Sequence, residues 1–142
     1  MIARAREHRA YAPIAAALIL SACGQREDRA AAPVADPATS VRVAEGQITG
    51  HVSPEGAHVW HAIPYAAPPV GDLRWRAPRP AEPWTGVREA LTRADRCPQI
   101  TNGLDEGRGV EAGLRVGQED CLYLDVYAPP DADGLPVMVW IH

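Results

Sequence analysis

From residue 41 onward, alternation of apolar and polar residues predicts extended strands. The alternation runs over 41–43 and again over 47–52, and the Ala-Glu-Gly between the two runs has the composition of a turn. A further alternating run over 57–63 follows Ser-Pro-Glu-Gly at 53–56, which is a second turn signal. We therefore expect a hairpin followed by a third strand.

Two histidines lie in the third of these runs. Side chains of a strand alternate between its two faces, so His58 shares a face with Trp60 whereas His61 points to the opposite face. The two imidazoles are therefore not expected to bind one metal ion. We interpret both histidines as polar residues of an edge strand.

The strongest strand signals come later, at 122–128 and 137–141, where β-branched and aromatic residues are frequent. The second is an almost continuous apolar run, which is typical of a strand buried on both faces inside a large sheet. Such a strand requires neighbours on both edges. Without them it exposes an apolar edge that favours aggregation.

The segment over 64–83 is rich in proline, which excludes a helix because proline lacks the amide donor and clashes with the preceding turn. A disordered linker is one interpretation of such a segment. Large apolar residues accompany the prolines, however, namely Tyr65, Leu73, Trp75 and Trp84. We expect these residues to anchor a rigid loop on a core.

Two segments between the strands are less regular. Propensity alone predicts a short helix over 87–95, with extended backbone as the alternative. Residues 101–118 contain five glycines and no aromatic residue, and Asn-Gly at 102–103 is a turn signal. We expect this second segment to be a surface loop.

Composition and net charge bear on whether the protein binds nucleic acid. The chain is 46% hydrophobic and 23% charged, which is globular on average, and every one of its 14 basic residues is arginine. Its net charge of −4 leaves no basic stripe to neutralise phosphates, so a nucleic-acid partner is not expected.

Residues 1–22 have the pattern of an export signal. Three arginines precede the apolar stretch 11–20, which is too short for a bilayer core that needs about 20 residues. The stretch ends in Leu-Ser-Ala-Cys, which resembles a bacterial lipobox with Cys23 as the acylated first residue of the mature chain. An ordinary signal peptide with an incidental cysteine is the alternative.

Residues 23–40 are expected to form a disordered tether. They contain no aromatic residue and a lone valine, so they cannot bury enough apolar surface to offset the entropy of ordering. The protein is then exported and lipid-anchored to a bacterial membrane, on its periplasmic or cell-surface side. Attachment through acyl chains, and not through basic residues, is the membrane interaction that we expect.

Five colinear segments of the remaining chain resemble the type-B carboxylesterases, the family that includes the carboxylesterases and the cholinesterases. The usual family pattern has glycine where this chain has Ala62. The segments are 62–66, 68–75, 83–88, 119–129 and 137–142.

This resemblance implies an α/β fold in which residues 41–142 are the N-terminal portion of an α/β-hydrolase domain. That portion would comprise a small antiparallel sheet and the first strands of the central mixed sheet, and it would be mostly strand and loop. The resemblance also implies extended backbone over 87–95, and we adopt that prediction in place of a helix.

The resemblance implies a disulfide between Cys97 and Cys121 that closes a long surface loop beside the active site. A cross-link of this size stabilises by about 3–4 kcal/mol in the chain-entropy model. Two free buried thiols are the alternative, and a zinc site is not expected from two thiols without a nearby histidine. In cholinesterases the same loop carries a tryptophan that binds a cationic head group, but 98–120 contain no aromatic residue. A broad class of carboxylic esters is therefore the expected substrate.

Arg74 and Glu119 occupy positions that form a salt bridge in the family. The pair would link the proline-rich segment to the base of the loop. Two independently solvated charges are the alternative.

The chemistry of the family needs a serine nucleophile at a strand-to-helix turn, a histidine base, an acidic partner and backbone donors for the oxyanion. The chain contains no Gly-x-Ser-x-Gly, and Ser21, Ser40 and Ser53 lie in the signal, the tether and a turn. His142 matches the first residue of the His-Gly-Gly-Gly segment that forms the oxyanion hole. We expect the catalytic residues beyond residue 142, no cofactor and no metal, and a chain that is inert as it stands.

Three functions remain open at this point. The first is the N-terminal fragment of an enzyme that hydrolyses small-molecule carboxylic esters. The second is a non-catalytic binding member of the same fold, and the third is a self-contained lipoprotein module. The DNA after the codon for His142 distinguishes them, because only the first predicts a frame that continues into the glycines and a later elbow serine.

Overall fold

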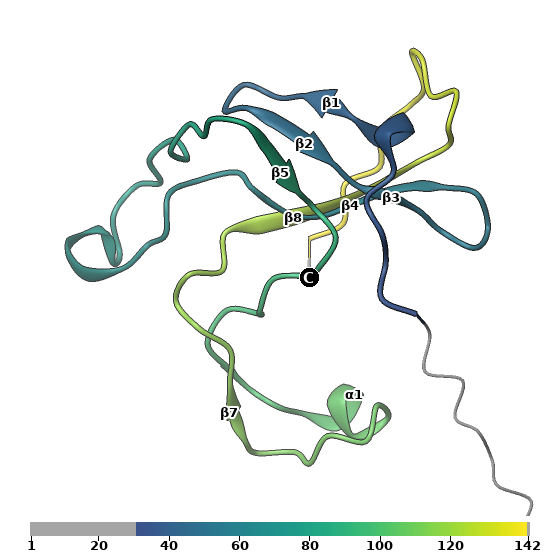
Figure 1. Cartoon of the computed structure of the whole chain (residues 1–142). Helices are drawn as coiled ribbons and strands as arrows, with labels where there is room; N and C mark the ends of the chain where they lie inside the picture. The colour runs from purple at the N-terminus through teal and green to yellow at the C-terminus, as the bar shows by residue number, and fades with distance from the viewer. Residues whose placement is uncertain (1–30, 142) are drawn as a thin grey trace, which may run out of the picture. The chain divides into compact units, whose positions relative to one another are not determined.

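The computed structural model describes residues 31–141, and the strands there form three small sheets (Figure 1). The first sheet has the order β1 (Val41–Arg42), β2 (Gln47–Thr49) and β5 (Val87–Glu89). The antiparallel pairing of β1 and β2 confirms the expected hairpin. The pairing of β2 with β5 is parallel, so this sheet is mixed and not the purely antiparallel sheet that we expected. The long connection between the two strands allows the parallel pairing.

The second sheet has the order β3 (His51–Val52), β4 (His58–Pro64) and β8 (Tyr123–Ala128), and both pairings are antiparallel. The strands expected over 57–63 and 122–128 are therefore confirmed. The strand expected over 47–52 is instead divided at Gly50, where the chain passes from the first sheet to the second. A Cβ atom at Gly50 would lie 2.0 Å from the Val59 carbonyl oxygen, so only glycine permits this close passage.

The core lies between these two sheets. Ile48 from β2, Trp60 from β4 and Ala90 after β5 are buried together, and the partly buried Trp84 packs against them. The Trp60 indole nitrogen donates to the Thr39 carbonyl oxygen at 2.8 Å, so the polar atom of this side chain is also satisfied.

The folded part begins before residue 41, so the expectation of a tether through residue 40 is wrong at its C-terminal end. A 3-10 turn, η1 (Pro37–Thr39), is capped by Asp36, and Thr39 is fully buried. The Thr39 hydroxyl accepts from the Gly50 amide at 2.8 Å. Burial here depends on hydrogen bonds of small polar residues, which a criterion based on apolar surface does not detect.

The proline-rich segment contains no helix beyond one 3-10 turn, η2 (Gly71–Leu73), as expected. Its anchoring is only partly as expected. Trp84 packs against the core and donates from its indole nitrogen to the Gln47 carbonyl oxygen at 2.9 Å. Trp75 is 98% exposed and Tyr65 is 55% exposed, so neither residue anchors the loop within the described part of the chain.

The strand expected over 137–141 is absent, and that prediction is wrong for this structure. The side chains of the run are exposed, from 75% at Val139 to 93% at Met138, and the run has no ladder partner among residues 31–141. A strand forms only where a neighbour accepts and donates its backbone hydrogen bonds, so β propensity alone does not produce one.

The remaining elements belong to the segment after β5. Residues 87–95 contain β5 and no helix, which confirms the extended backbone. The surface loop contains slightly more structure than expected. A third sheet pairs β6 (Gln99–Ile100) with β7 (Arg115–Val116), and a single helical turn, α1 (Gly103–Glu106), lies between them.

Candidate functional site

No serine of the described residues is set up as a nucleophile. The Ser40 hydroxyl lies 2.9 Å from that of Thr49, and the Ser53 hydroxyl accepts from the Ala57 amide at 3.2 Å. The Ser40 hydroxyl therefore bonds to strand β2 and the Ser53 hydroxyl bonds within its turn, and neither bonds to a histidine in the described part of the chain.

The most concentrated group of ionisable side chains surrounds Asp125 on β8. One carboxylate oxygen accepts from the Ala62 amide at 3.0 Å, and the other lies 3.0 Å from His61 Nδ1 and 3.5 Å from Arg93 Nε. The contact with His61 has the distance of an ion pair but is out of line for a hydrogen bond. Arg93 also donates to the hydroxyl of Tyr127, which closes the group on its exposed side.

The sheet order corrects the interpretation of His58 and His61 as polar residues of an edge strand. β4 is the middle strand of its sheet, and His61 is only 9% exposed. Its ring stacks near those of His51, at 5.5 Å between centroids, and Tyr127, at 5.8 Å. A histidine paired with a carboxylate resembles the base of a catalytic triad. The serine hydroxyls of residues 31–141 bond to Thr49 and Ala57 and not to this pair.

His58 lies on the other face of β4, beside Trp60, with 6.0 Å between the ring centroids. The expectation that the two histidines do not share a metal ion therefore agrees with the geometry. Residues 31–141 contain no group of three or more histidine, cysteine or acidic side chains arranged to hold a metal ion.

The surface loop between β5 and β8 is closed by the Cys97–Cys121 disulfide, with 5.0 Å between the Cα atoms. The Gln118 amide donates to the Arg96 carbonyl oxygen at 3.0 Å beside this cross-link. Gly117 has a φ of +87°, and a Cβ atom there would lie 2.3 Å from the same carbonyl oxygen. The two chain segments at the neck of the loop therefore approach more closely than any other residue would allow.

Inside the loop, Asp105 connects the helical turn to the neck. Its carboxylate accepts from Arg96 Nη1 at 2.5 Å and from the Asn102 amide at 2.9 Å. The hydrogen bond from Arg96, followed by the one from Asn102, holds the pKa of the Asp105 carboxyl below its ordinary value. The residue is 7% exposed, so this carboxylate is part of the loop's interior and not of its solvated surface.

At the base of the loop, Arg74 Nη2 lies 2.8 Å from Glu119 Oε1. The two side chains are 57% and 40% exposed, so the pair is a solvent-screened contact that connects the proline-rich segment to the loop. Nearby, burial raises the pKa of the Tyr123 hydroxyl, and a hydrogen bond to Asp120 adds to the effect.

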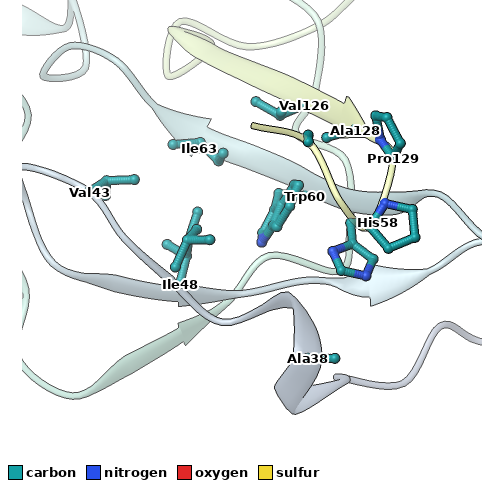
Figure 2. A pocket seen from close by; sticks show the side chains of 12 residues that line it. Ala38, Val43, Ile48, His58, Trp60, Ile63, Val126, Ala128 and Pro129 are labelled. Carbon is teal, nitrogen blue, oxygen red and sulfur yellow. The ribbon is translucent and has the colours of Figure 1, made fainter. Parts of the chain in front are cut away.

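An apolar hollow of about 440 Å³ lies between the two larger sheets (Figure 2). Trp60 points into it, with Ile48 on one side and Val126 on the other. His58 is the only lining residue with an ionisable side chain, so the lining offers no hydroxyl, thiol or carboxylate. Its lining is formed by Ala38, Val41, Val43, Ile48, His58, Trp60, Ile63, Val126, Ala128, Pro129, Pro130 and Ala132.

Two of the predicted site residues lie outside the described part of the chain, namely the lipidation site Cys23 and the oxyanion residue His142. No helix within residues 31–141 has the length and apolar character that crossing a bilayer requires.

Sequence reasoning missed Asp105 and the group around Asp125. Asp105 carried a usable signal, because Asn102 followed three residues later by Asp105 has the spacing of a capping box. The group around Asp125 carried none, because it depends on how β8 is aligned with β4 across 63 residues of chain.

Comparison with protein families gives a match between residues 37–142 and the model of the carboxylesterase family. Carboxylesterase 1E of Mus musculus is 40% identical over 116 residues, which cover 72% of this chain and 20% of the mouse protein. Para-nitrobenzyl esterase of Bacillus subtilis (strain 168) is 43% identical over 98 residues, covering 68% of this chain and 19% of that protein. Phenmedipham hydrolase of Pseudarthrobacter oxydans is 46% identical over 90 residues, covering 62% of this chain and 18% of the hydrolase.

Among solved structures, a PNB esterase superposes with a TM-score of 0.63 at 41% identity, covering 73% of this chain and 21% of the esterase. A thermophilic PNB esterase gives the same TM-score at 40% identity, covering 73% and 21%. These likenesses confirm the predicted α/β fold class, the N-terminal portion of an α/β-hydrolase fold. The chain spans about one fifth of the length of the curated relatives that it matches.

Proposed function

Because this chain belongs to the carboxylesterase family, we propose that it is the N-terminal part of a serine hydrolase that cleaves carboxylic esters through an acyl-enzyme. The observation that carries the proposal is the match of the family model to residues 37–142. Relatives named as esterases and hydrolases share 37% to 46% identity with this chain. They are about four times as long as this chain, and we place the catalytic serine, base and acid in the part of the enzyme that corresponds to their remaining length.

The reaction divides between the two parts of such an enzyme. Ester cleavage needs a nucleophile activated by a base, and donors that stabilise the oxyanion of the tetrahedral intermediate. His142 would begin the segment whose glycine amides supply those donors. The described residues contribute the sheets that this segment would join and a cross-linked loop with a defined conformation.

We propose uncharged small-molecule esters as the substrates. An aromatic face that binds a quaternary ammonium group by cation–π contact is absent from 98–120, which contain no Trp, Tyr or Phe. The large apolar side chains exposed on the loop are aliphatic instead, namely Ile100, Leu104 and Leu114. Aliphatic surface favours apolar ester groups and gives no attraction to a cation.

We further propose that the enzyme is exported and anchored through acylated Cys23, with the bilayer as its membrane partner. The lipobox-like Leu-Ser-Ala-Cys at 20–23 supports this location, and the acidic net charge of −4 supports acyl chains over basic residues as the means of attachment.

The proposal is tested with the mature protein encoded by the complete reading frame. Initial rates are measured with acetylthiocholine and with S-(3,3-dimethylbutyl) thioacetate, its uncharged carbon isostere, which share the acetyl thioester and differ in the charge of the leaving group. We expect kcat/KM for the neutral ester to be higher by about tenfold or more, since one cation–π contact supplies about 1–2 kcal/mol. A preference for the thiocholine ester contradicts the substrate class only. A monodisperse, folded protein that hydrolyses neither ester contradicts the enzyme and favours the non-catalytic binding module.

A further inference from the structure

The loop between Cys97 and Cys121 contains a network of internal hydrogen bonds in addition to the disulfide that closes it. Thr101 is 3% exposed and forms the centre of this network. Its amide donates to the Leu114 carbonyl oxygen at 2.9 Å, and its carbonyl oxygen accepts from the Gly113 amide at 2.9 Å. Its hydroxyl accepts from the Leu114 amide at 2.9 Å and donates to the Glu111 carbonyl oxygen at 2.6 Å.

A second set of contacts connects the tip of the loop to its neck. Asp105 accepts from Arg96 at 2.5 Å and from Asn102 at 2.9 Å, while its carbonyl oxygen accepts from the amides of Arg108 and Val110 at 2.9 and 3.1 Å. Arg96 directly precedes Cys97, so its ion pair fixes the tip against the same point of the chain that the disulfide fixes.

The two closures differ in the chemistry that releases them. Cys97 is exposed, so an external dithiol has access to the disulfide. The dithiol gives two electrons and two protons, leaves as its own disulfide, and yields free thiols at Cys97 and Cys121. Asp105 has lost most of its exposure, and its ion pair is released by protonation or by removal of the carboxylate.

We propose that the loop is held by two independent latches, the Cys97–Cys121 disulfide and the Arg96–Asp105 pair with the neck hydrogen bonds, and that it opens only when both are released. The disulfide closes residues 97–121, and the hydrogen bond from the Gln118 amide to the Arg96 carbonyl oxygen closes the nearly coincident stretch 96–118. The Arg96–Asp105 pair fixes the helical turn inside that stretch. Loss of one therefore frees little conformational entropy while the other remains. The loop then keeps its conformation under reducing conditions at neutral pH, and it opens in acid only if the disulfide is also reduced.

Hydrogen exchange of the full-length mature protein tests this. The loop amides of Thr101, Gly113 and Leu114 are compared with the amides of His61 and Ala90, which donate to the Ala90 and Thr49 carbonyl oxygens and report unfolding of the core. Four proteins are required besides the wild type. They are Cys97→Ser with Cys121→Ser, Asp105→Asn, the combination of all three changes, and Glu111→Gln, a control that removes a charge from the same loop without an ion pair to Arg96.

We expect the disulfide variant and the Asp105 variant each to lose less than about tenfold in protection at the loop amides. The combined variant should lose more than about a hundredfold. Glu111→Gln should match the wild type. Complete loss of loop protection in the disulfide variant alone, or loop protection retained in the combined variant, overturns the proposal.

If a variant fails to fold, as shown by loss of protection at His61 and Ala90, the wild-type protein is reduced with dithiothreitol at neutral pH instead. Retained loop protection after full reduction supports the second latch, and loss of that protection with an intact sheet contradicts it.

Discussion

Ala62 is held in a backbone conformation that alanine seldom adopts. Its φ is +54°, and it lies at the point where the pairing of β4 with β8 shifts register between Trp60 and Ile63. In the left-handed region the Cβ atom crowds the following carbonyl oxygen. The hydrogen bond from the Ala62 amide to Asp125 holds the residue there. This conformation explains physically why glycine is the usual residue at this position of the family pattern.

Ala62→Gly should therefore stabilise the full-length protein. Relief of a left-handed alanine is worth about 1–2 kcal/mol, and the added freedom of glycine in the unfolded chain opposes it by about 0.5–1 kcal/mol. The expected net gain is about 0.5–1 kcal/mol in the free energy of unfolding, measured with urea. Ala57→Gly is the control, since Ala57 has no positive φ and glycine there should destabilise. A loss of stability in Ala62→Gly shows that the left-handed alanine carries no strain.

Asp125 is the single group that contacts Ala62, His61 and Arg93. Asp125→Asn preserves the shape of the side chain and removes its charge, which leaves the Arg93 guanidinium facing an amide. We expect a loss of about 1–3 kcal/mol in the free energy of unfolding. The exposed Asp131, which has no ion pair among the described residues, gives the matched control Asp131→Asn. Equal effects of the two substitutions would show that the Asp125 group is solvated charge.

At the scale of elements, residue patterns within a segment predicted the strands whose formation depends on that segment and its adjacent turn. Alternation and turn residues predicted the β1–β2 hairpin and the strands β4 and β8. The 137–141 run had the composition of a strand but formed none, because a strand depends on neighbours that its own residues do not specify. The division of 47–52 at Gly50 was missed for a similar reason, since it depends on the Val59 carbonyl oxygen in another strand.

The cross-linked loop should show a pH dependence that originates in Asp105. The hydrogen bonds from Arg96 and Asn102 hold the pKa of its carboxyl below the ordinary value of 3.8, so the folded state binds a proton less readily than the unfolded state. The resulting stabilisation is fully present above about pH 5, and it is lost as pH falls through 3.8 toward the folded pKa. The difference in unfolding free energy between wild type and Asp105→Asn should therefore be constant near neutrality and shrink in acid. A difference that grows as pH falls would contradict the assigned direction.

At the scale of the whole molecule, two contacts that the family resemblance implies lie within the described residues. The disulfide and the Arg74–Glu119 pair are where the family resemblance placed them. The triad could not be located from these residues, because Ser40 bonds to Thr49, Ser53 bonds to Ala57, and the described histidines bond to neither serine. The apolar side chains over 137–141 remain exposed in this chain, from 75% to 93%.

Membrane attachment is expected to depend on Cys23. Cys23→Ser should abolish acylation and move the exported protein from the membrane fraction to the soluble fraction, or leave its signal unprocessed, because two or more acyl chains are needed for stable anchoring. Intact mass and fractionation measure this, with Gln25→Ala as a neighbouring change that should leave acylation intact. Unchanged acylation and partition in Cys23→Ser would leave an ordinary signal peptide as the explanation.

The most direct test of the central claim is to trap the acyl-enzyme or its phosphonylated equivalent. A fluorophosphonate that reacts with activated serines is applied to the protein of the complete reading frame and to the chain 23–142, and the adducts are mapped by peptide mass. We predict an adduct on a serine outside this chain in the complete protein, together with loss of p-nitrophenyl acetate hydrolysis, and no adduct on the chain 23–142. An adduct on Ser40 or Ser53, or ester hydrolysis by the chain 23–142 itself, would contradict the account.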